Sequence, residues 1–335
     1  MMTNRLASVA GICLSLIFLT ASAQQPKEPG PIAAQQPAST TSSLPVAEQL
    51  RKTVAFLTVT YRNGSTVGGV IGTCFFVSYL DPRLGENTGF LYLVTNRHVA
   101  QPGIDLGTPY DIQTASIRLN LATPTAQAQS VQESIQFGGR VQWHFPADNA
   151  VDLAVLPVGP DQKLFDFVSI PSNIIVTADR LKTGDVGVSD PIKFAGYFSN
   201  FPGHNRMEPI VREGVIAMVP QEDVETTLHK KGPIILADLH AFHGNSGSPV
   251  FVNIGGEHRR VFTPGENYLL LGVVSGYYPE SAGFSVPAAA VLTGEVRDNS
   301  GITAIVPAYQ LLDLLNSPEL QADRDNLLPI VAKKK

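Results

Sequence analysis

The chain has 335 residues, of which 44% are hydrophobic and 16% are charged, and its formal net charge is −5. A chain of this length and apolar content can bury a core without the disulfides on which small exported domains depend. The basic residues form no block apart from Lys333, Lys334 and Lys335 at the end. Because nucleic-acid binding needs a basic patch, we expect no nucleic-acid partner.

The first 23 residues have the pattern of a bacterial signal peptide. Arg5 gives a positive start, residues 6–20 are largely apolar, and the small residues 21–23 form a cleavage site before Gln24. The apolar run is too short to favour a membrane-spanning helix, and no later stretch approaches the required length. We therefore predict a secreted or periplasmic protein that has no stable membrane insertion after the signal peptide is cleaved.

The sequence has two cysteines, Cys13 and Cys74. Lipoprotein anchoring through Cys13 is an alternative to cleavage, but Ile12 stands before it where a small residue is expected. If Cys13 leaves with the signal peptide, Cys74 is alone and no internal disulfide can form. Cys74 lies in the apolar run 72–77, which is typical of a buried small hydrophobe rather than a catalytic thiol.

Residues 24–47 are rich in Gln, Pro, Ala, Ser and Thr. Such a segment cannot bury enough apolar surface to become ordered, so we predict a disordered leader. A propeptide is the sharper alternative for the same segment.

From residue 54 onward, short β-branched and aromatic runs alternate with Gly, Pro, Asn and Asp. Runs of this kind span residues 54–59, 70–79, 90–95, 117–121, 210–218 and 268–275. Closely spaced short strands favour an all-β sandwich or barrel. The late segment 307–315 differs, because a proline start and a dense apolar face are typical of a helix.

Two breaks in the strand pattern, Gly159-Pro160 and Pro171-Ser172, separate the two halves of the chain. We expect an N-terminal β-barrel at residues 48–165. A C-terminal β-barrel with the terminal helix follows at 166–318, and residues 319–335 form a tail.

The most informative segment is Gly-Asn-Ser-Gly-Ser-Pro at 244–249, which sets Ser246 in a glycine-flanked turn before an apolar run. A serine hydroxyl is a poor nucleophile, so a catalytic serine needs a histidine base, an orienting carboxylate and nearby N–H donors. His98 ends the strand-like run in Leu-Val-Thr-Asn-Arg-His-Val-Ala, and Asp152 begins the run Asp-Leu-Ala-Val. These residues can supply the base and the carboxylate.

The chain order His98, Asp152, Ser246 belongs to the chymotrypsin arrangement, whereas subtilisins and α/β-hydrolases use other orders. The chain resembles bacterial trypsin-like serine proteases of the chymotrypsin fold. The wording of its histidine and serine motifs is nearest to that of the V8, or glutamyl endopeptidase, group. The resemblance covers roughly residues 50–316. Asp148 competes for the aspartate position, but Asp152 matches the family pattern Asp-[Ile/Leu]-Ala.

The resemblance implies an all-β protein of two six-stranded-type β-barrels with a short C-terminal helix. It also implies an exported serine endopeptidase that hydrolyses protein or peptide substrates without a cofactor. In this family Ser246 is the nucleophile, His98 the general base and Asp152 the residue that orients the imidazole. The backbone N–H groups of Gly244 and Ser246 form the oxyanion hole.

The resemblance also places a substrate pocket. Its base is His240, six residues before the nucleophile, and one wall contains Ser275 and Gly276, whose backbone can pair with substrate as an added strand. The absence of aspartate at the base disfavours a trypsin-like preference for Lys or Arg. Glutamyl endopeptidases carry a histidine where Val274 falls, so their preference does not carry over directly.

Asn245 departs from the trypsin-like zymogens, which have an aspartate directly before the nucleophile that pairs with a new N-terminal ammonium. An ammonium buried beside Asn245 would lack a counter-ion, and an unpaired buried charge is costly. We therefore expect hydrogen bonds from the Asn245 amide and neighbouring backbone to hold the turn.

Two other functions compete with the peptidase. A catalytically weak or inactive binding or regulatory module can use the same fold, although the complete set of three residues argues against it. An α/β-hydrolase esterase conflicts with the residue order and with Ser248, where that family has glycine. The remaining histidines have no i, i+4 pair and no cysteine support, so we expect no metal site.

Overall fold

The computed structural model describes residues 33–35, 44–124, 129–135, 141–255, 267–286 and 292–332. The predicted signal peptide at 1–23 lies outside the described residues. The first half of the chain forms an eight-stranded sheet with the order β1-β4-β3-β2-β5-β6, in which β7 pairs with β4 and β8 pairs with β3. Its strands are β1 (Ala33–Gln35), β2 (Val54–Asn63), β3 (Thr66–Leu80), β4 (Thr88–Thr95), β5 (Asp111–Asn120), β6 (Ser130–Ser134), β7 (Ala154–Pro157) and β8 (Ile170–Pro171).

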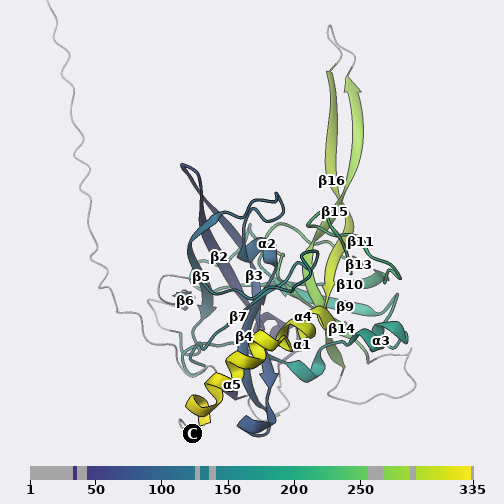
Figure 1. Ribbon diagram of the computed structural model, residues 1–335. Helices are drawn as coiled ribbons and strands as arrows, with labels where there is room; N and C mark the ends of the chain where they lie inside the picture. The colour runs from purple at the N-terminus through teal and green to yellow at the C-terminus, as the bar shows by residue number, and fades with distance from the viewer. Residues whose placement is uncertain are drawn as a thin grey trace, which may run out of the picture.

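The second half forms a closed barrel with the order β10-β13-β16-β15-β14-β9 (Figure 1). The barrel strands are β9 (Pro191–Gly196), β10 (Ile210–Met218), β13 (Ile235–Asp238), β14 (Pro249–Asn253), β15 (Tyr268–Val286) and β16 (Leu292–Pro307). A short pair, β11 (Val224–Glu225) and β12 (Lys231–Gly232), lies outside the barrel. The all-β prediction with a terminal helix is confirmed.

Successive side chains of a strand point to opposite faces, and the two faces of β3 contribute to two different hydrophobic cores. Along β3, Cys74 and Phe76 pack into the interior of the first sheet, whereas Phe75 and Val77 face a cluster shared with the second half of the chain. Because both faces of these strands are covered, they read as continuous apolar runs rather than alternating ones. Cys74 is completely buried, as predicted for a small hydrophobe, and burial raises the pKa of its thiol.

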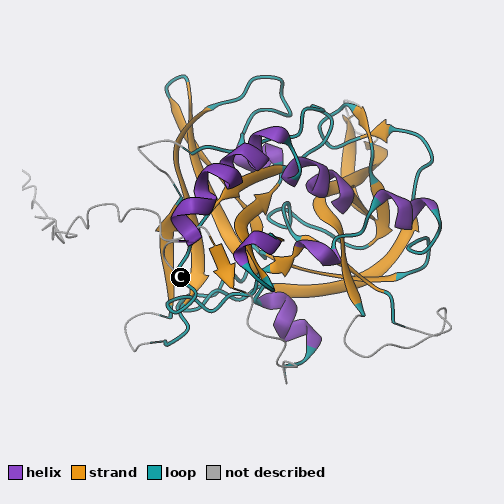
Figure 2. Ribbon diagram, turned by 60° about the horizontal axis from the view of Figure 1, so that its bottom comes forward, coloured by secondary structure: helices purple, strands orange, loops and turns teal. Residues whose placement is uncertain are grey.

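The helices are short apart from the last one, and they lie on the outside of the strands (Figure 2). They are α1 (Val46–Arg51), α2 (Arg97–Ala100), α3 (Ala178–Lys182), α4 (Ala308–Leu315) and α5 (Pro318–Ala332), with the 3-10 turns η1 (Pro82–Leu84) and η2 (Ser172–Ile174). Helix α4 is the predicted C-terminal helix. Pro307 precedes its first residue, and Leu311, Leu314 and Leu315 are buried on one face.

Two segments differ from the sequence-based expectation. Residues 33–35 of the predicted disordered leader pair with residues 88–90 of β4, and α1 begins within the same leader. Residues 319–335 were expected as a tail, but most of them belong to α5. In both cases a local composition without a strong apolar pattern is stabilised by contacts with distant parts of the chain.

Arg324 fixes α5 to the first sheet. Its guanidinium lies 4.0 Å from the centre of the Tyr79 ring, and its Nη1 donates to Tyr92 Oη at 3.1 Å and to the Leu315 carbonyl at 2.8 Å. The residue is only 3% exposed. A buried charge is tolerated there because it has hydrogen-bond acceptors and an aromatic face.

We expect Arg324→Ala to lower the free energy of unfolding by about 2 kcal/mol, because it leaves the Leu315 carbonyl and the Tyr92 hydroxyl without their donor. Urea denaturation followed by circular dichroism measures this change. Gln321→Ala, at an exposed position of the same helix, is the control and should change stability by less than about 0.5 kcal/mol. Equal losses in the two variants would show that Arg324 does not anchor the helix.

Candidate active site

His98 is placed by a strand that ends in a short helix. All eight residues of β4 are buried, and Asn96 then starts α2, in which His98 is the second residue. The side chain of Asn96 donates to the Asp152 carbonyl at 2.8 Å. Val99, a residue of α2 itself, is buried. The imidazole is therefore held on a fixed backbone, with 25% of its side chain exposed.

Asp152 is separated from β7 only by Leu153 and is 1% exposed. Its Oδ1 accepts the backbone N–H of His98 at 3.0 Å, its Oδ2 lies 2.7 Å from His98 Nδ1, and Ser275 Oγ donates to Oδ2 at 2.5 Å. Asp148 instead accepts the Ala150 N–H at 2.8 Å within a turn. The structure thus joins Asp152, and not Asp148, to His98.

The contact between His98 and Asp152 shifts the pKa values of both groups. Burial opposes protonation of the His98 imidazole, but the charge and the hydrogen bond of Asp152 outweigh it, so the pKa of His98 is raised. Burial also disfavours the Asp152 carboxylate. The charge and hydrogen bonds of His98, together with the Ser275 hydroxyl, outweigh this effect and lower the pKa of Asp152. The arrangement favours an ionised carboxylate beside an imidazole that is readily protonated.

Ser246 lies against the first sheet, close to α2. The Thr73 N–H donates to the Ser246 carbonyl at 2.9 Å. A Cβ on Gly72 would lie 2.9 Å from Val99 Cγ1 and 3.2 Å from the Ser246 carbonyl oxygen, so a larger residue would push the two apart. Ser246 Oγ donates to the Ser275 carbonyl at 3.3 Å, and no hydrogen bond joins it to His98 within the described part of the chain.

Asn245 holds the turn around Ser246, as predicted from the sequence. It is completely buried. Its Oδ1 accepts the Phe242 N–H at 2.8 Å, and its Nδ2 donates to the Tyr197 carbonyl at 2.6 Å. Its backbone N–H donates to the Phe242 carbonyl and its carbonyl accepts the Ser248 N–H, both at 2.9 Å. The turn is therefore fixed through a neutral amide.

The conformation of this turn requires glycine on both sides of the serine. Gly244 has a φ of 93° and Gly247 a φ of 87°, values that are unfavourable for residues with a Cβ. Thr73 Oγ1 donates to the Gly244 carbonyl at 2.8 Å, which fixes the next peptide plane. Among the described residues, the N–H groups of Gly244 and Ser246 have no hydrogen-bond acceptor. They are available to bind an oxygen anion.

The three residues predicted to bind substrate have different surroundings. His240 is exposed, and a Cβ on Gly301 would lie 3.0 Å from its imidazole Cε1. Ser275 is buried, and its hydroxyl bonds to Asp152 as well as to Thr227 Oγ1 at 2.5 Å. A Cβ on Gly276 would lie 3.1 Å from the Thr227 methyl group. His240 is thus not enclosed, and the Ser275 hydroxyl serves Asp152 rather than an incoming side chain.

The roles of Thr73, Asn96 and Thr227 were not predicted, although Asn96 lies within the histidine motif. Each acts through a contact with a residue far along the chain, such as Gly244 for Thr73 and Asp152 for Asn96. Threonine and asparagine are common in strands and turns, so no local pattern predicts which distant residues they contact.

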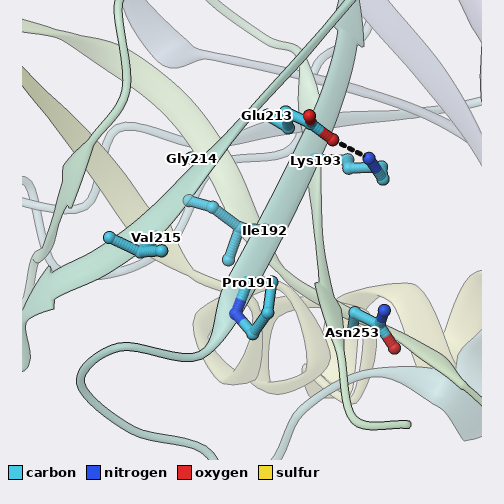
Figure 3. A pocket seen from close by; sticks show the side chains of 7 residues that line it. All are labelled: Pro191, Ile192, Lys193, Glu213, Gly214, Val215 and Asn253. Atoms are coloured by element: carbon cyan, nitrogen blue, oxygen red, sulfur yellow. Dashed lines mark hydrogen bonds and ion pairs between the residues drawn. The ribbon is translucent and has the colours of Figure 1, made fainter. Parts of the chain in front are cut away.

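The described residues contain no group of three or more His, Cys, Asp or Glu side chains placed to hold a metal ion. Within the same part of the chain, no helix combines the length and the apolar character needed to cross a membrane. A surface hollow of about 370 Å³ lies on β9, β10 and β14, where Lys193 and Glu213 form an ion pair at its rim (Figure 3). Its lining shares no residue with the candidate active site.

Comparisons with known proteins agree with the motifs. A family model described as "Trypsin-like peptidase domain" matches residues 72–257, a range that contains His98, Asp152 and Ser246. A search of curated proteins found no match.

A search of solved structures also returned matches. The active form of the Rv3671c protease from M. tuberculosis is 14% identical, with 88% of this chain and 93% of that chain covered and a TM-score of 0.43. Deg5 is 16% identical, with 67% and 85% covered and a TM-score of 0.38. The HtrA-type protease AlgW, solved with a decapeptide, is 15% identical, with 81% and 65% covered and a TM-score of 0.43.

We expect Asn245→Asp to destabilise the turn more than a surface change does, because a carboxylate there would face the Tyr197 carbonyl and have no cation beside it. The expected loss is about 2 to 3 kcal/mol in the free energy of unfolding, measured by urea denaturation at pH 7. Asn205→Asp, at an exposed position, is the matched control and should have little effect. An unchanged stability for Asn245→Asp would contradict the neutral-amide account of the turn.

Proposed function

The chain belongs to the family of trypsin-like peptidase domains, and we propose that it is an exported serine endopeptidase that uses Ser246, His98 and Asp152 as its catalytic triad. The observation that carries the proposal is the buried carboxylate of Asp152, which lies 2.7 Å from His98 Nδ1. This pair stands beside a serine turn whose N–H groups are available for an anion. A packed structural histidine would not need that combination.

The geometry supports the following reaction. Asp152 accepts a hydrogen bond from the Nδ1–H of His98, which keeps the proton on Nδ1 and leaves the lone pair of Nε2 free to act as general base. Ser246 Oγ leaves the Ser275 carbonyl, transfers its proton to His98 Nε2 and attacks the scissile carbonyl carbon. The hydrogen bond between a catalytic hydroxyl and its base often forms only when substrate is bound.

The N–H groups of Gly244 and Ser246 stabilise the negative charge that develops on the carbonyl oxygen. Asp152 stabilises the imidazolium of His98, which then gives its proton to the leaving amine. Water, activated by the same imidazole, hydrolyses the acyl group from Ser246 Oγ and regenerates the hydroxyl. The reaction needs no cofactor, and each proton is returned within the cycle.

Export and the position within the family are further parts of the proposal. The signal-peptide pattern at residues 1–23 supports secretion or a periplasmic location. The wording of the histidine and serine motifs supports a place near the glutamyl endopeptidases. Val274, which stands where that group has a histidine, is completely buried and apolar, so we do not extend their substrate preference to this chain.

An inactive binding module is the second candidate. One observation favours it: Ser246 Oγ bonds to the Ser275 carbonyl at 3.3 Å and not to His98. Covalent labelling by a fluorophosphonate separates the two candidates, because only a serine activated by its base reacts readily with the probe.

We expect Ser246→Ala to keep the fold and to lower the kcat/KM for peptide hydrolysis by about 10⁶-fold, with His98→Ala similar and the double variant little worse. Ser248→Ala is the control in the same turn, since Ser248 is buried and its hydroxyl has no hydrogen-bond partner among the described residues. It should keep both hydrolysis and fluorophosphonate labelling. Undiminished hydrolysis by purified Ser246→Ala protein would end the serine-peptidase proposal.

We also expect kcat/KM to fall on acidification, because protonated His98 cannot accept the serine proton. Burial opposes protonation but Asp152 outweighs it, so the pKa of His98 is raised and the midpoint lies above the ordinary histidine value. Asp152→Asn removes the charge, which should move the midpoint to lower pH and reduce kcat by about 10⁴-fold. A pH–rate profile tests this, with Asp148→Asn as the control that leaves the midpoint in place. An identical midpoint in Asp152→Asn would contradict the assigned pair.

A further inference from the structure

Strands β15 and β16 continue beyond the barrel as a two-stranded ribbon, here called the arm and defined as residues 279–286 and 292–299. Their register runs from the pair Pro279 and Asn299 to the pair Val286 and Leu292. Figure 1 shows the arm projecting well past the other strands. In the described part of the chain, each arm strand pairs only with the other. An isolated ribbon of this kind is marginally stable in water, and its outer edges offer unpaired N–H and C=O groups.

The outer edge of β15 becomes free beside the predicted nucleophile. Pairing between β14 and β15 ends at Val273. At the next residue of β15, Val274, the serine turn replaces β14 as the hydrogen-bonding partner. The Gly247 N–H donates to the Val274 carbonyl, and the Val274 N–H donates to the Ser248 carbonyl, both at 2.9 Å. The next carbonyl, that of Ser275, is the one that accepts Ser246 Oγ. One strand edge therefore runs from the nucleophile into the arm.

The direction of this edge determines which part of a substrate reaches the arm. Strand β15 runs outward from Ser275 to Val286. A peptide paired antiparallel to it, which is the more stable arrangement, runs inward and brings its scissile carbonyl to Ser246. Its residues on the acyl side, N-terminal to the scissile bond, then extend along the arm. At about 3.3 Å per residue, the edge beyond Ser275 can accompany roughly ten substrate residues.

Pro279 at the base of the arm agrees with an edge position. Proline has no N–H to donate, so within sheets it occurs on edge strands and at bulges. The register of β15 and β16 shifts between Tyr277 and Pro279, which marks an irregularity at this point. Pairing resumes at Pro279, opposite Asn299, and continues through Glu280 and Asp298 to the end of the described arm.

We propose that the arm is an extended substrate-binding edge, which takes up by β-pairing the acyl-side residues more than about four positions from the scissile bond. Its ligand is an unfolded polypeptide in extended conformation, because a folded chain cannot offer such a strand. The proposal rests on the endopeptidase function proposed above.

A length series of peptides tests the arm. The probes are acetyl-capped peptides that share the same residues next to a fluorogenic leaving group and carry two, four, six or eight acyl-side residues. We expect the kcat/KM of the wild-type protein to rise at least tenfold between four and eight residues. In a shortened variant, residues 281–297 are replaced by Asn-Gly, which suits a two-residue hairpin turn between the paired Glu280 and Asp298. This variant should cleave the short peptides normally and lose the rise.

Backbone methylation gives a second readout that needs no variant. Because only alternate residues of a paired strand turn their N–H groups toward one neighbour, a scan of single N-methyl groups along the eight-residue peptide should reduce kcat/KM at every second outer position. Removing the paired residues Arg62 and Val67 shortens the β2–β3 hairpin instead. This control should leave the length dependence unchanged.

Each outcome decides the proposal. Equal length dependence in the wild-type and shortened proteins, or a flat methylation scan, would overturn it. A change of oligomeric state in the shortened variant, seen by sedimentation, would overturn it in favour of pairing between copies of this chain. Fluorophosphonate labelling of both proteins keeps the two hypotheses apart: loss of all labelling refutes the endopeptidase, whereas labelling without length dependence refutes only the arm.

Discussion

The arrangement of the molecule depends on the hydrogen bonds that the buried carboxylate of Asp152 accepts. A charge with 1% exposure is stable only if donors replace the water it has lost. Two of its donors, the N–H and the imidazole of His98, come from the first half of the chain, and the third, the Ser275 hydroxyl, comes from the second half. The two halves must therefore meet in one relative position for this charge to be satisfied. The same position brings the serine turn against the first sheet.

Residues of the first sheet also hold the serine turn in place. Thr73, on the first sheet, accepts the Tyr197 N–H at 2.9 Å and donates to the Gly244 carbonyl at 2.8 Å. The Thr95 hydroxyl donates to the Thr73 carbonyl, and a Cβ on Gly247 would lie 2.0 Å from that carbonyl oxygen. The turn thus packs against β3, whose residue Thr73 is itself held by hydrogen bonds. Pre-organised donors of this kind need no rearrangement when charge develops.

The sequence predicted those features whose cause is local. Short apolar runs indicated strands, and the motifs around His98 and Asp152 indicated two side chains that lie in contact in the structure. The role of Asn245 could also be predicted, because it follows from the absence of a charge at one position. The bond between Ser275 and Asp152 could not be predicted, since it joins residues 123 positions apart in sequence. Helix α5 was missed for the same reason, because its contacts through Arg324 reach Tyr79 and Tyr92; the arm was missed because its apolar pattern is weak.

The contacts of Arg324 with Tyr79 and Tyr92 have a consequence for the order in which the protein folds. The Arg324 guanidinium and the Tyr92 ring come from positions 232 residues apart, and a ribosome releases the tyrosine long before the arginine. The aromatic surface of Tyr79 and Tyr92 can therefore be covered only late, and contacts of such long range slow folding. A chain cut short before α5 keeps that surface uncovered. The cover of Tyr79 and Tyr92 therefore depends on a cation that is synthesised 232 residues after Tyr92.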